Sequence, residues 1–236
     1  RVYTLIEECI NYGTIPFSIL ARHGFIAKIL MQSLIELEII SSDEMQKFEL
    51  GIKTVASSLV EDMQNLQNQS LSKKEFMQKY GHLRPGTYDI MSTRYDQVKN
   101  FGENNEKLEK SSSDKKFKLS KGQKKSIDIL LKNEGFEKFN SASLFDYFNE
   151  AIVGREYGKF IFTKYVSNIL ELIADFGGEQ GLSREEMSHI PLHKILEYTM
   201  KTSSKPLEAE LREISEYEAR KYKLSSAIRL PQVLFD

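Results

Sequence analysis

The stretch MQKFELGIKTVASSLVEDMQNL, residues 45–66, indicates the fold class, because its apolar side chains recur every three or four positions. This spacing is the period of an α-helix, and it predicts one continuous helix with a buried stripe. Segments 19–37, 162–176 and 207–217 repeat the same period. In the first of them, the stripe that we expect to be buried consists of Ile19, Ile26, Leu30, Leu34 and Leu37.

Helix start signals agree with this periodicity. A Ser followed three residues later by Glu or Gln has the spacing of a capping box, in which each residue satisfies a backbone N–H of the other. Four such pairs occur: Ser41 with Glu44, Ser72 with Glu75, Ser120 with Gln123, and Ser183 with Glu186. Period-two alternation bounded by hairpin turns is nearly absent. The predicted fold class is therefore all-α, a multi-helix bundle or array.

One change in composition divides the chain. Residues 100–118 are polar and rich in Ser and Lys, which is typical of a loop or linker. We therefore expect two helical subdomains, residues 1–99 and 119–236, the second leading toward a C-terminal domain that is missing here. Eight lysines lie between Lys107 and Lys125. They could bind phosphate, but a solvated connection is the favoured interpretation.

Composition limits the class of protein. The 33 Lys and Arg nearly balance the 34 Asp and Glu, so no global charge favours nucleic acid or an anionic membrane as a partner. The apolar stretch 25–40 is interrupted by Lys28, Glu36 and Glu38, which argues against an ordinary membrane-spanning helix. Cys9 is the single cysteine, so an internal disulfide is excluded and a reducing compartment fits. We expect a cytoplasmic protein without membrane or nucleic-acid partners.

Both ends of the sequence suggest a piece of a longer protein. Residue 1 is an Arg that already belongs to an amphipathic pattern, with no signal-like apolar segment. Residues 227–236 are apolar and would need a surface to pack against.

The stretch KYGHLRPGTYDI, residues 79–90, combines special backbone residues with ionisable side chains. Gly81 stands where a left-handed helix C-cap is expected, and Pro85 disfavours a helical conformation at Arg84. Pro85 and Gly86 suit the centre of a type II turn. The sequence thus predicts a rigid non-helical elbow within residues 79–90, the YGHLRPGTYD elbow.

The elbow carries the candidate site residues. The Arg84 guanidinium offers a fork of donors to a carboxylate or phosphate, and His82 can donate or exchange a proton near neutral pH. Tyr88 and Asp89 follow and would position them. The alternative, which the residues alone favour, is an internal Arg84–Asp89 pair that holds the elbow shut, with His82 as a satisfied buried donor.

Residues 80–95, YGHLRPGTYDIMSTRY, also resemble a known family. The element is similar to one in phosphoenolpyruvate-synthase-like enzymes, which include the rifampin phosphotransferase branch and the pyruvate, phosphate dikinase relatives. Three flanking segments resemble the central region of that family as well: YGTIPF at 12–17, ARHGFIA at 21–27 and REYGKF at 155–160.

The resemblance implies a division of labour. In that family an ATP-grasp domain takes phosphate from ATP, a mobile domain carries it on a phosphohistidine, and a mostly helical region lies between them. This chain resembles the middle region alone. ATP and Mg²⁺ are therefore implied for the parent protein, and no cofactor or metal site is expected in this chain. The flanking domains are the expected partners, with a small-molecule acceptor as the bound substrate.

By this reading the chain contributes acceptor binding or domain docking, and by itself it is inactive as an enzyme. The expected substrate-binding residues are Arg84, His82, Tyr88 and Asp89, and His82 is the one catalytic candidate. Because the resemblance includes them, Arg22 and His23 are added as residues at the pocket edge. The alternative is a non-catalytic helical protein-interaction module whose elbow is only a structural latch.

Overall fold

The computed structural model describes residues 1–102, 117–198 and 205–228, and within these ranges it contains helices and no strand. The prediction of an all-α fold is confirmed. Most of the predicted linker, residues 103–116, lies outside the described ranges. The elements in chain order are α1 (Val2–Glu8), the π-helical η1 (Cys9–Thr14), α2 (Ile15–Glu36), α3 (Ser42–Leu50), α4 (Val55–Gln67), α5 (Lys73–Tyr80), the 3₁₀ turn η2 (Tyr95–Gln97), α6 (Lys121–Asn133), α7 (Ser141–Glu179), α8 (Arg184–Ser188), α9 (Leu192–Tyr198) and α10 (Leu207–Ser226).

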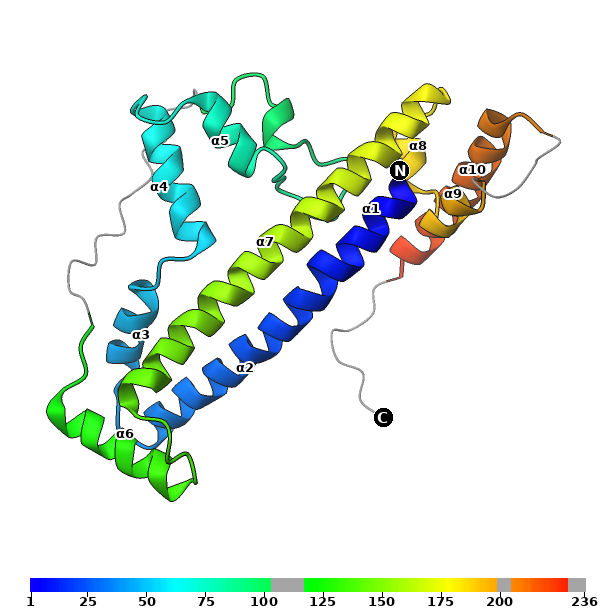
Figure 1. Cartoon of the computed structure of the whole chain (residues 1–236). Helices are drawn as coiled ribbons and strands as arrows, with labels where there is room; N and C mark the ends of the chain where they lie inside the picture. Colours follow the sequence, from blue (N-terminus) through cyan, green and yellow to red (C-terminus); the bar gives the residue numbers. More distant parts are fainter. Residues whose placement is uncertain (103–116, 199–204, 229–236) are drawn as a thin grey trace.

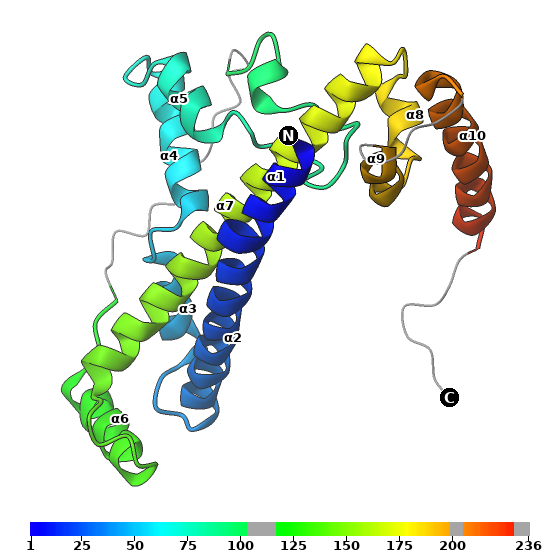
Figure 2. The ribbon, with the colours of Figure 1, turned by 45° about the vertical axis from the view of Figure 1, so that its right-hand side comes forward.

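Two long antiparallel helical runs form the frame of the molecule (Figure 1). One is the continuous run α1–η1–α2, and the other is α7, whose 39 residues span about 58 Å at 1.5 Å per residue. The two runs approach closely because α7 has a glycine at the crossing. A Cβ on Gly158 would lie 2.9 Å from Leu20 Cδ1 and 3.4 Å from Phe17 Cα. Helices α3 and α6 pack at one end of this frame and α8, α9 and α10 at the other (Figure 2).

Helix starts follow the predicted signals. All four predicted capping boxes are present with both reciprocal hydrogen bonds. Two more boxes occur at Thr54 with Ser57 and at Asn140 with Ser143.

The prediction of one continuous helix over residues 45–66 is wrong. Helix α3 ends at Leu50, and α4 begins at Val55 after a break of four residues. Thr54 is extended, and its side chain caps the Ser57 N–H. A glycine at position 51 followed by a good N-cap residue favours a stop and a restart, even though the apolar period runs through both helices.

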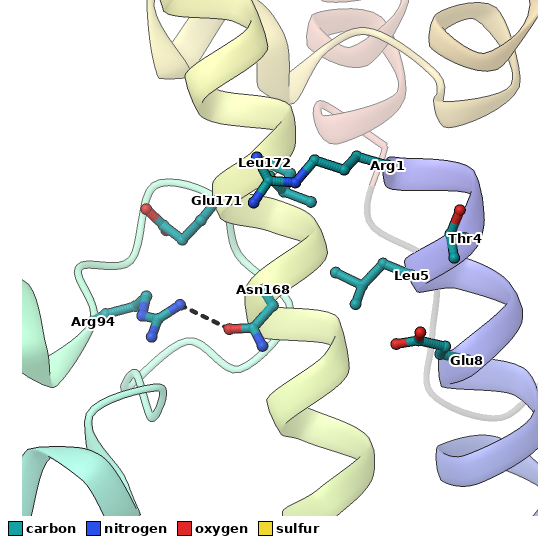
Figure 3. A pocket seen from close by; sticks show the side chains of 8 residues that line it. All are labelled: Arg1, Thr4, Leu5, Glu8, Arg94, Asn168, Glu171 and Leu172. Atoms are coloured by element: carbon teal, nitrogen blue, oxygen red, sulfur yellow. Dashed lines mark hydrogen bonds between the residues drawn. The ribbon is translucent and has the colours of Figure 1, made fainter.

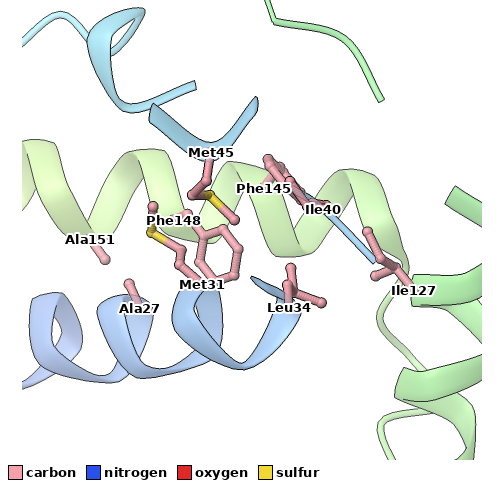
Figure 4. Packing of buried hydrophobic residues seen from close by; sticks show 9 residues of the cluster. All are labelled: Ala27, Met31, Leu34, Ile40, Met45, Ile127, Phe145, Phe148 and Ala151. Carbon is pink, nitrogen blue, oxygen red and sulfur yellow. The ribbon is translucent and has the colours of Figure 1, made fainter. Parts of the chain in front are cut away.

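A first apolar core joins residues from both sides of the predicted linker (Figure 4). Its buried side chains come from α2, the connection between α2 and α3, α3, α6 and α7, and its members are Ala27, Met31, Leu34, Ile40, Met45, Ile127, Phe145, Phe148 and Ala151. The two predicted subdomains thus pack on one another through a shared core. A second cluster lies at the far end of α7 and consists of Ile90, Ile173, Ala174, Leu182, Met187, Ile190, Ile195 and Leu211.

The predicted helix over residues 19–37 is confirmed, but its expected stripe is not buried. Ile19 is 52% exposed and Ile26 is 47% exposed, whereas Leu34 lies in the core. Helix α7 covers a different face of α2, the one that carries Ala27, Met31 and Leu34. Among the described residues, the run Val2–Glu36 is the one helix whose length and composition would allow it to cross a membrane, and 17% of its apolar window is buried. The interrupted stretch 25–40 did not reveal this, because the apolar run begins further upstream.

Candidate functional site: a latched elbow beside an apolar pocket

The elbow is closed at its base by main-chain hydrogen bonds. The returning segment donates from Asp96 N to Gly81 O at 3.1 Å and from Tyr95 N to Leu83 O at 2.9 Å. The left-handed cap expected at Gly81 is wrong, since its φ is −57°. The chain needs glycine there for space, because a Cβ would lie 2.4 Å from Met77 O.

The turn at Pro85 and Gly86 also differs from the prediction. Gly86 does not have the positive φ that a type II turn centred on Pro85 and Gly86 requires. Instead Asp89 N donates to Gly86 O at 3.0 Å, which closes a turn centred two residues further along, on Thr87 and Tyr88. The Gly86 N–H is bound by Ser92 Oγ at 2.9 Å. A Cβ on Gly86 would lie 3.0 Å from Asp89 Cβ, so close packing inside the elbow explains this glycine.

Arg84 is the centre of the elbow, and its side chain is only 1% exposed. The guanidinium donates to the main-chain oxygens of Asp89 and Ser92 at 3.2 and 3.1 Å. It also donates to Ser167 Oγ and to Glu171 Oε1, the latter at 2.8 Å. Arg84 therefore ties Asp89 and Ser92 to the C-terminal half of α7, and we call this arrangement the Arg84 latch.

Glu171 is the anion of the latch. Its Oε1 accepts from Arg84, and its Oε2 accepts from Arg184 at 2.6 Å and from Gln97 at 2.5 Å. Burial by itself would raise the pKa of this carboxyl, but the hydrogen bonds from Arg184, Gln97 and Arg84 outweigh it and lower the pKa to about 2. Glu171 is therefore ionised at neutral pH and balances a buried guanidinium.

The geometry favours the internal latch over an anion-binding fork at Arg84. The proposed partner was the Asp89 carboxylate, but Arg84 binds the Asp89 main-chain oxygen and pairs with Glu171. The Asp89 side chain instead accepts the Met91 N–H at 2.8 Å through Oδ1 and is exposed. For Arg84 to bind a substrate anion, as the sequence predicts, its contacts with Asp89 and Glu171 would have to break.

His82 lies inside the protein, 4% exposed, with its ring edge against Phe160 at a centroid distance of 4.7 Å. Its Nε2 is buried and has no hydrogen-bond partner among the described residues, so the expectation of a satisfied donor is not met. Burial, with smaller contributions from the positive charges of Lys164 and Arg94, lowers the pKa of His82 to about 4. The imidazole is therefore neutral at pH 7.

This pKa predicts a pH-dependent stability. The pKa of His82 in the folded chain, about 4, lies below the ordinary value of 6.5, so the unfolded chain takes up the proton first as the pH falls. The contribution of His82 to the free energy of unfolding has its full value above pH 6.5, and it decreases toward pH 4 by up to about 3 kcal/mol. Denaturant unfolding at pH 7.0 and pH 4.8 measures the loss, and His82→Gln should remove most of it. An unchanged pH dependence in that variant would contradict the assignment.

Residues 88–90, which we call the tip of the elbow, form one wall of a pocket of about 460 Å³. We call this pocket the apolar pocket. Residues 88–90 face η1 across it, and α7 and the α8–α9 segment supply the remaining walls. The lining residues are Ile6, Cys9, Ile10, Tyr88, Asp89, Ile90, Val166, Ile169, Leu170, Ile173, Met187, Ser188, Ile190, Leu192 and Ile195. Cys9 is buried, as expected for a small core residue, and burial raises the pKa of its thiol. An apolar pocket with a few polar groups at its edge is typical of small-molecule sites.

A second, polar pocket of about 560 Å³ lies on another face of α7, between the returning arm of the elbow and α1 (Figure 3). Arg94 lies on one side of it, and Leu5 and Glu8 lie on the other. The Arg94 guanidinium already binds Asp96 and Asn168, the latter at 3.0 Å. Its lining includes residues of both charges and no residue of the elbow tip, so we regard the apolar pocket as the better candidate site.

The predicted site residues therefore separate into three groups. Tyr88 and Asp89 line the apolar pocket, and both are exposed at its edge. His82 and Arg84 lie behind the wall and are absent from its lining.

Arg22 and His23 lie elsewhere. Both are exposed on α2, and His23 Nδ1 is 3.2 Å from Tyr147 Oη. Tyr147 precedes the latch residue Ser167 by 20 positions on α7, which corresponds to about 30 Å. The structure does not bring Arg22 and His23 to the elbow.

Sequence reasoning missed the residues of α7 and α8 that hold the elbow. Ser167 and Glu171 lie in a helix that was predicted from its apolar period alone, which gives no role to its polar residues. Arg184 is the first residue of α8. One signal was available: Glu171 is an acidic residue within the apolar segment NILELIADF, residues 168–176.

No protein-family model, curated protein or solved structure matches the chain. The resemblance of residues 80–95 to phosphoenolpyruvate-synthase-like enzymes therefore stays a prediction from the sequence.

Proposed function

We propose that this chain is the central helical domain of a phosphoenolpyruvate-synthase-like phosphotransferase and that its apolar pocket holds the phosphoryl-acceptor substrate. One observation carries the proposal: the tip of the elbow, within the segment that bears the resemblance, forms a wall of the apolar pocket. In this proposal Tyr88 and Asp89 contact the substrate. Arg84 is a positioning residue, because it fixes the main chain that presents them.

The chemistry is divided between this chain and its neighbours in the polypeptide. Flanking ATP-grasp and phosphohistidine domains, with ATP and Mg²⁺, would supply the phosphoryl group. This chain would bind the acceptor and exclude water from its apolar body. Tyr88 and Asp89 are exposed, so an acceptor group held beside them is open to an approaching domain.

A pair of matched substitutions tests the proposal. Ile10 is 47% exposed and lines the apolar pocket, whereas Ile15 is 49% exposed, lies one turn further along the same run and does not line it. We expect Ile10→Trp to fill the pocket and to weaken the binding of the neutral probe 1-decanol at least about tenfold, which corresponds to 1.4 kcal/mol. Ile15→Trp should leave binding unchanged. Isothermal titration calorimetry of the purified chain measures both.

The same variants should be compared in the complete native polypeptide. Uptake of phosphate from ATP onto a histidine should occur and should survive Ile10→Trp, because that half-reaction does not need the acceptor pocket. A polypeptide that takes up no phosphate, or a chain that binds no 1-decanol, would contradict the proposal.

A second candidate function is a helical protein-interaction module, and the exposed face of α2 favours it. Ile15, Ile19, Ile26 and Ile29 are each about half exposed or more along one side of this helix. Exposed apolar patches of this kind mark protein contacts. If this function is the correct one, Ile15→Trp rather than Ile10→Trp will alter the behaviour of the native polypeptide.

A further inference from the structure

Building on the proposed acceptor pocket, we propose that the substrate it selects is an apolar molecule that bears a cationic amine, and that it discriminates against carboxylates. This inference concerns the class of ligand, which neither the fold nor the resemblance specifies. It depends on which charged groups face the pocket and which face away from it.

Among the described residues, the lining of the apolar pocket contains no cationic side chain. Of its 15 residues, 11 are aliphatic side chains or Met, and the rest are Cys9, Tyr88, Asp89 and Ser188. Asp89 carries the one carboxylate among these side chains, and burial raises the pKa of the Cys9 thiol, which keeps that thiol neutral at pH 7. The only full charge among the lining side chains is therefore negative.

The nearby guanidiniums are already bound on the other side of the wall. Arg84 donates to the main-chain oxygen of Asp89, and Arg184 donates to that of Ile90 at 3.0 Å. Both also pair with Glu171, which neutralises one of the two charges. Within the part of the chain that the structure describes, a carboxylate in the pocket would find no free guanidinium on this wall, and it would lie near Asp89.

Asp89 is held in a defined orientation at the edge of the pocket. Its Oδ1 accepts the Met91 N–H at 2.8 Å, which fixes the carboxylate relative to the turn. Among the described residues this is the one hydrogen bond recorded for its side chain, so Oδ2 is available to a ligand. A carboxylate fixed at the edge of an apolar pocket suits an ammonium group with an apolar body.

A series of three probes with one alkyl chain isolates the effect of the head group. The probes are 1-decylamine, 1-decanol and decanoate, titrated into the purified chain at pH 7.0 below the concentrations at which they form micelles. At this pH the amine is protonated and the acid is ionised. We expect decylamine to bind about tenfold more tightly than decanol, and decanoate to bind most weakly.

Asp89→Asn is the variant that tests the assigned residue, because the amide keeps Oδ1 as acceptor for Met91. It should lower the affinity for decylamine about tenfold, leave that for decanol unchanged and raise that for decanoate. Asp146→Asn, at an exposed acid on the opposite end of α7, is the matched control and should change none of the three.

The outcomes separate this inference from the proposed function. If none of the probes binds, or if Ile10→Trp does not affect binding, the acceptor pocket itself is refuted. If decanol binds in an Ile10-dependent way but decanoate binds as tightly as decylamine, the pocket stands and the amine preference is wrong. An amine preference that survives Asp89→Asn would also overturn the inference, since the assigned acceptor would not be responsible.

Discussion

Arg84→Ala is expected to lower the free energy of unfolding by about 3 to 5 kcal/mol, because it removes a buried charged group from a hydrogen-bonded network. The main-chain oxygen of Ser92 would lose its side-chain donor, that of Asp89 would keep only the Ser92 N–H, and Ser167 Oγ would keep only its bond to His82 O. For a chain of this size the change corresponds to a drop of roughly 10 °C in melting temperature. Differential scanning calorimetry measures it directly.

Two comparisons make this result specific to the latch. Arg84→Lys keeps the charge but lacks the planar fork, so it should fall between the wild type and Arg84→Ala. Arg22→Ala, at an exposed position of α2, should stay within about 0.5 kcal/mol of the wild type. An Arg84→Ala chain that melts like the wild type would mean that the guanidinium is available to a ligand, as the anion-fork interpretation of the sequence supposed.

Phe148→Ala is the second large effect that we expect, a loss of about 3 to 5 kcal/mol from a fully buried ring. Phe148 lies where α7 meets side chains from α2, α3 and α6. The substitution should therefore destabilise helices on both sides of the predicted linker. In native-state hydrogen exchange, amides of α2 and α6 should lose protection together.

Phe139→Ala is the control, since that ring is 55% exposed in the turn before α7, and its removal should change stability by about 0.5 kcal/mol or less. Loss of protection confined to residues 119–198 in Phe148→Ala would support two independent subdomains instead of a shared core.

Much of the fold could be predicted because helix starts and helix periods are local properties. The capping boxes at Ser41, Ser72, Ser120 and Ser183 require only residues three apart, and all four form. The break between Leu50 and Val55 was missed because the apolar period continues through it. Which residues are buried was harder to predict, because an apolar period shows that a helix has an apolar face but not which neighbour covers it. Ile19 and Ile26 belong to the predicted stripe, yet both are exposed.

The candidate site was predictable only in part. The sequence identified the elbow, and Tyr88 and Asp89 do line a pocket. The partner of Arg84 could not be found from spacing, because Glu171 lies 87 positions away along the chain. A guanidinium next to a proline turn has the same local sequence whether it faces a ligand or the interior. Only the tertiary packing of the elbow on α7 distinguishes the two.

The central claim is that a latched elbow walls a pocket that binds an apolar acceptor, and the most direct measurement is a map of backbone amide chemical shifts during a 1-decanol titration. We predict shifts at residues 88–90 of the elbow, at Cys9 and Ile10 of η1 and at Val166 to Ile173 of α7, with little change along the exposed face of α2. Shifts confined to Ile15, Ile19 and Ile26, with none at the elbow tip, would contradict the claim and favour an interaction surface.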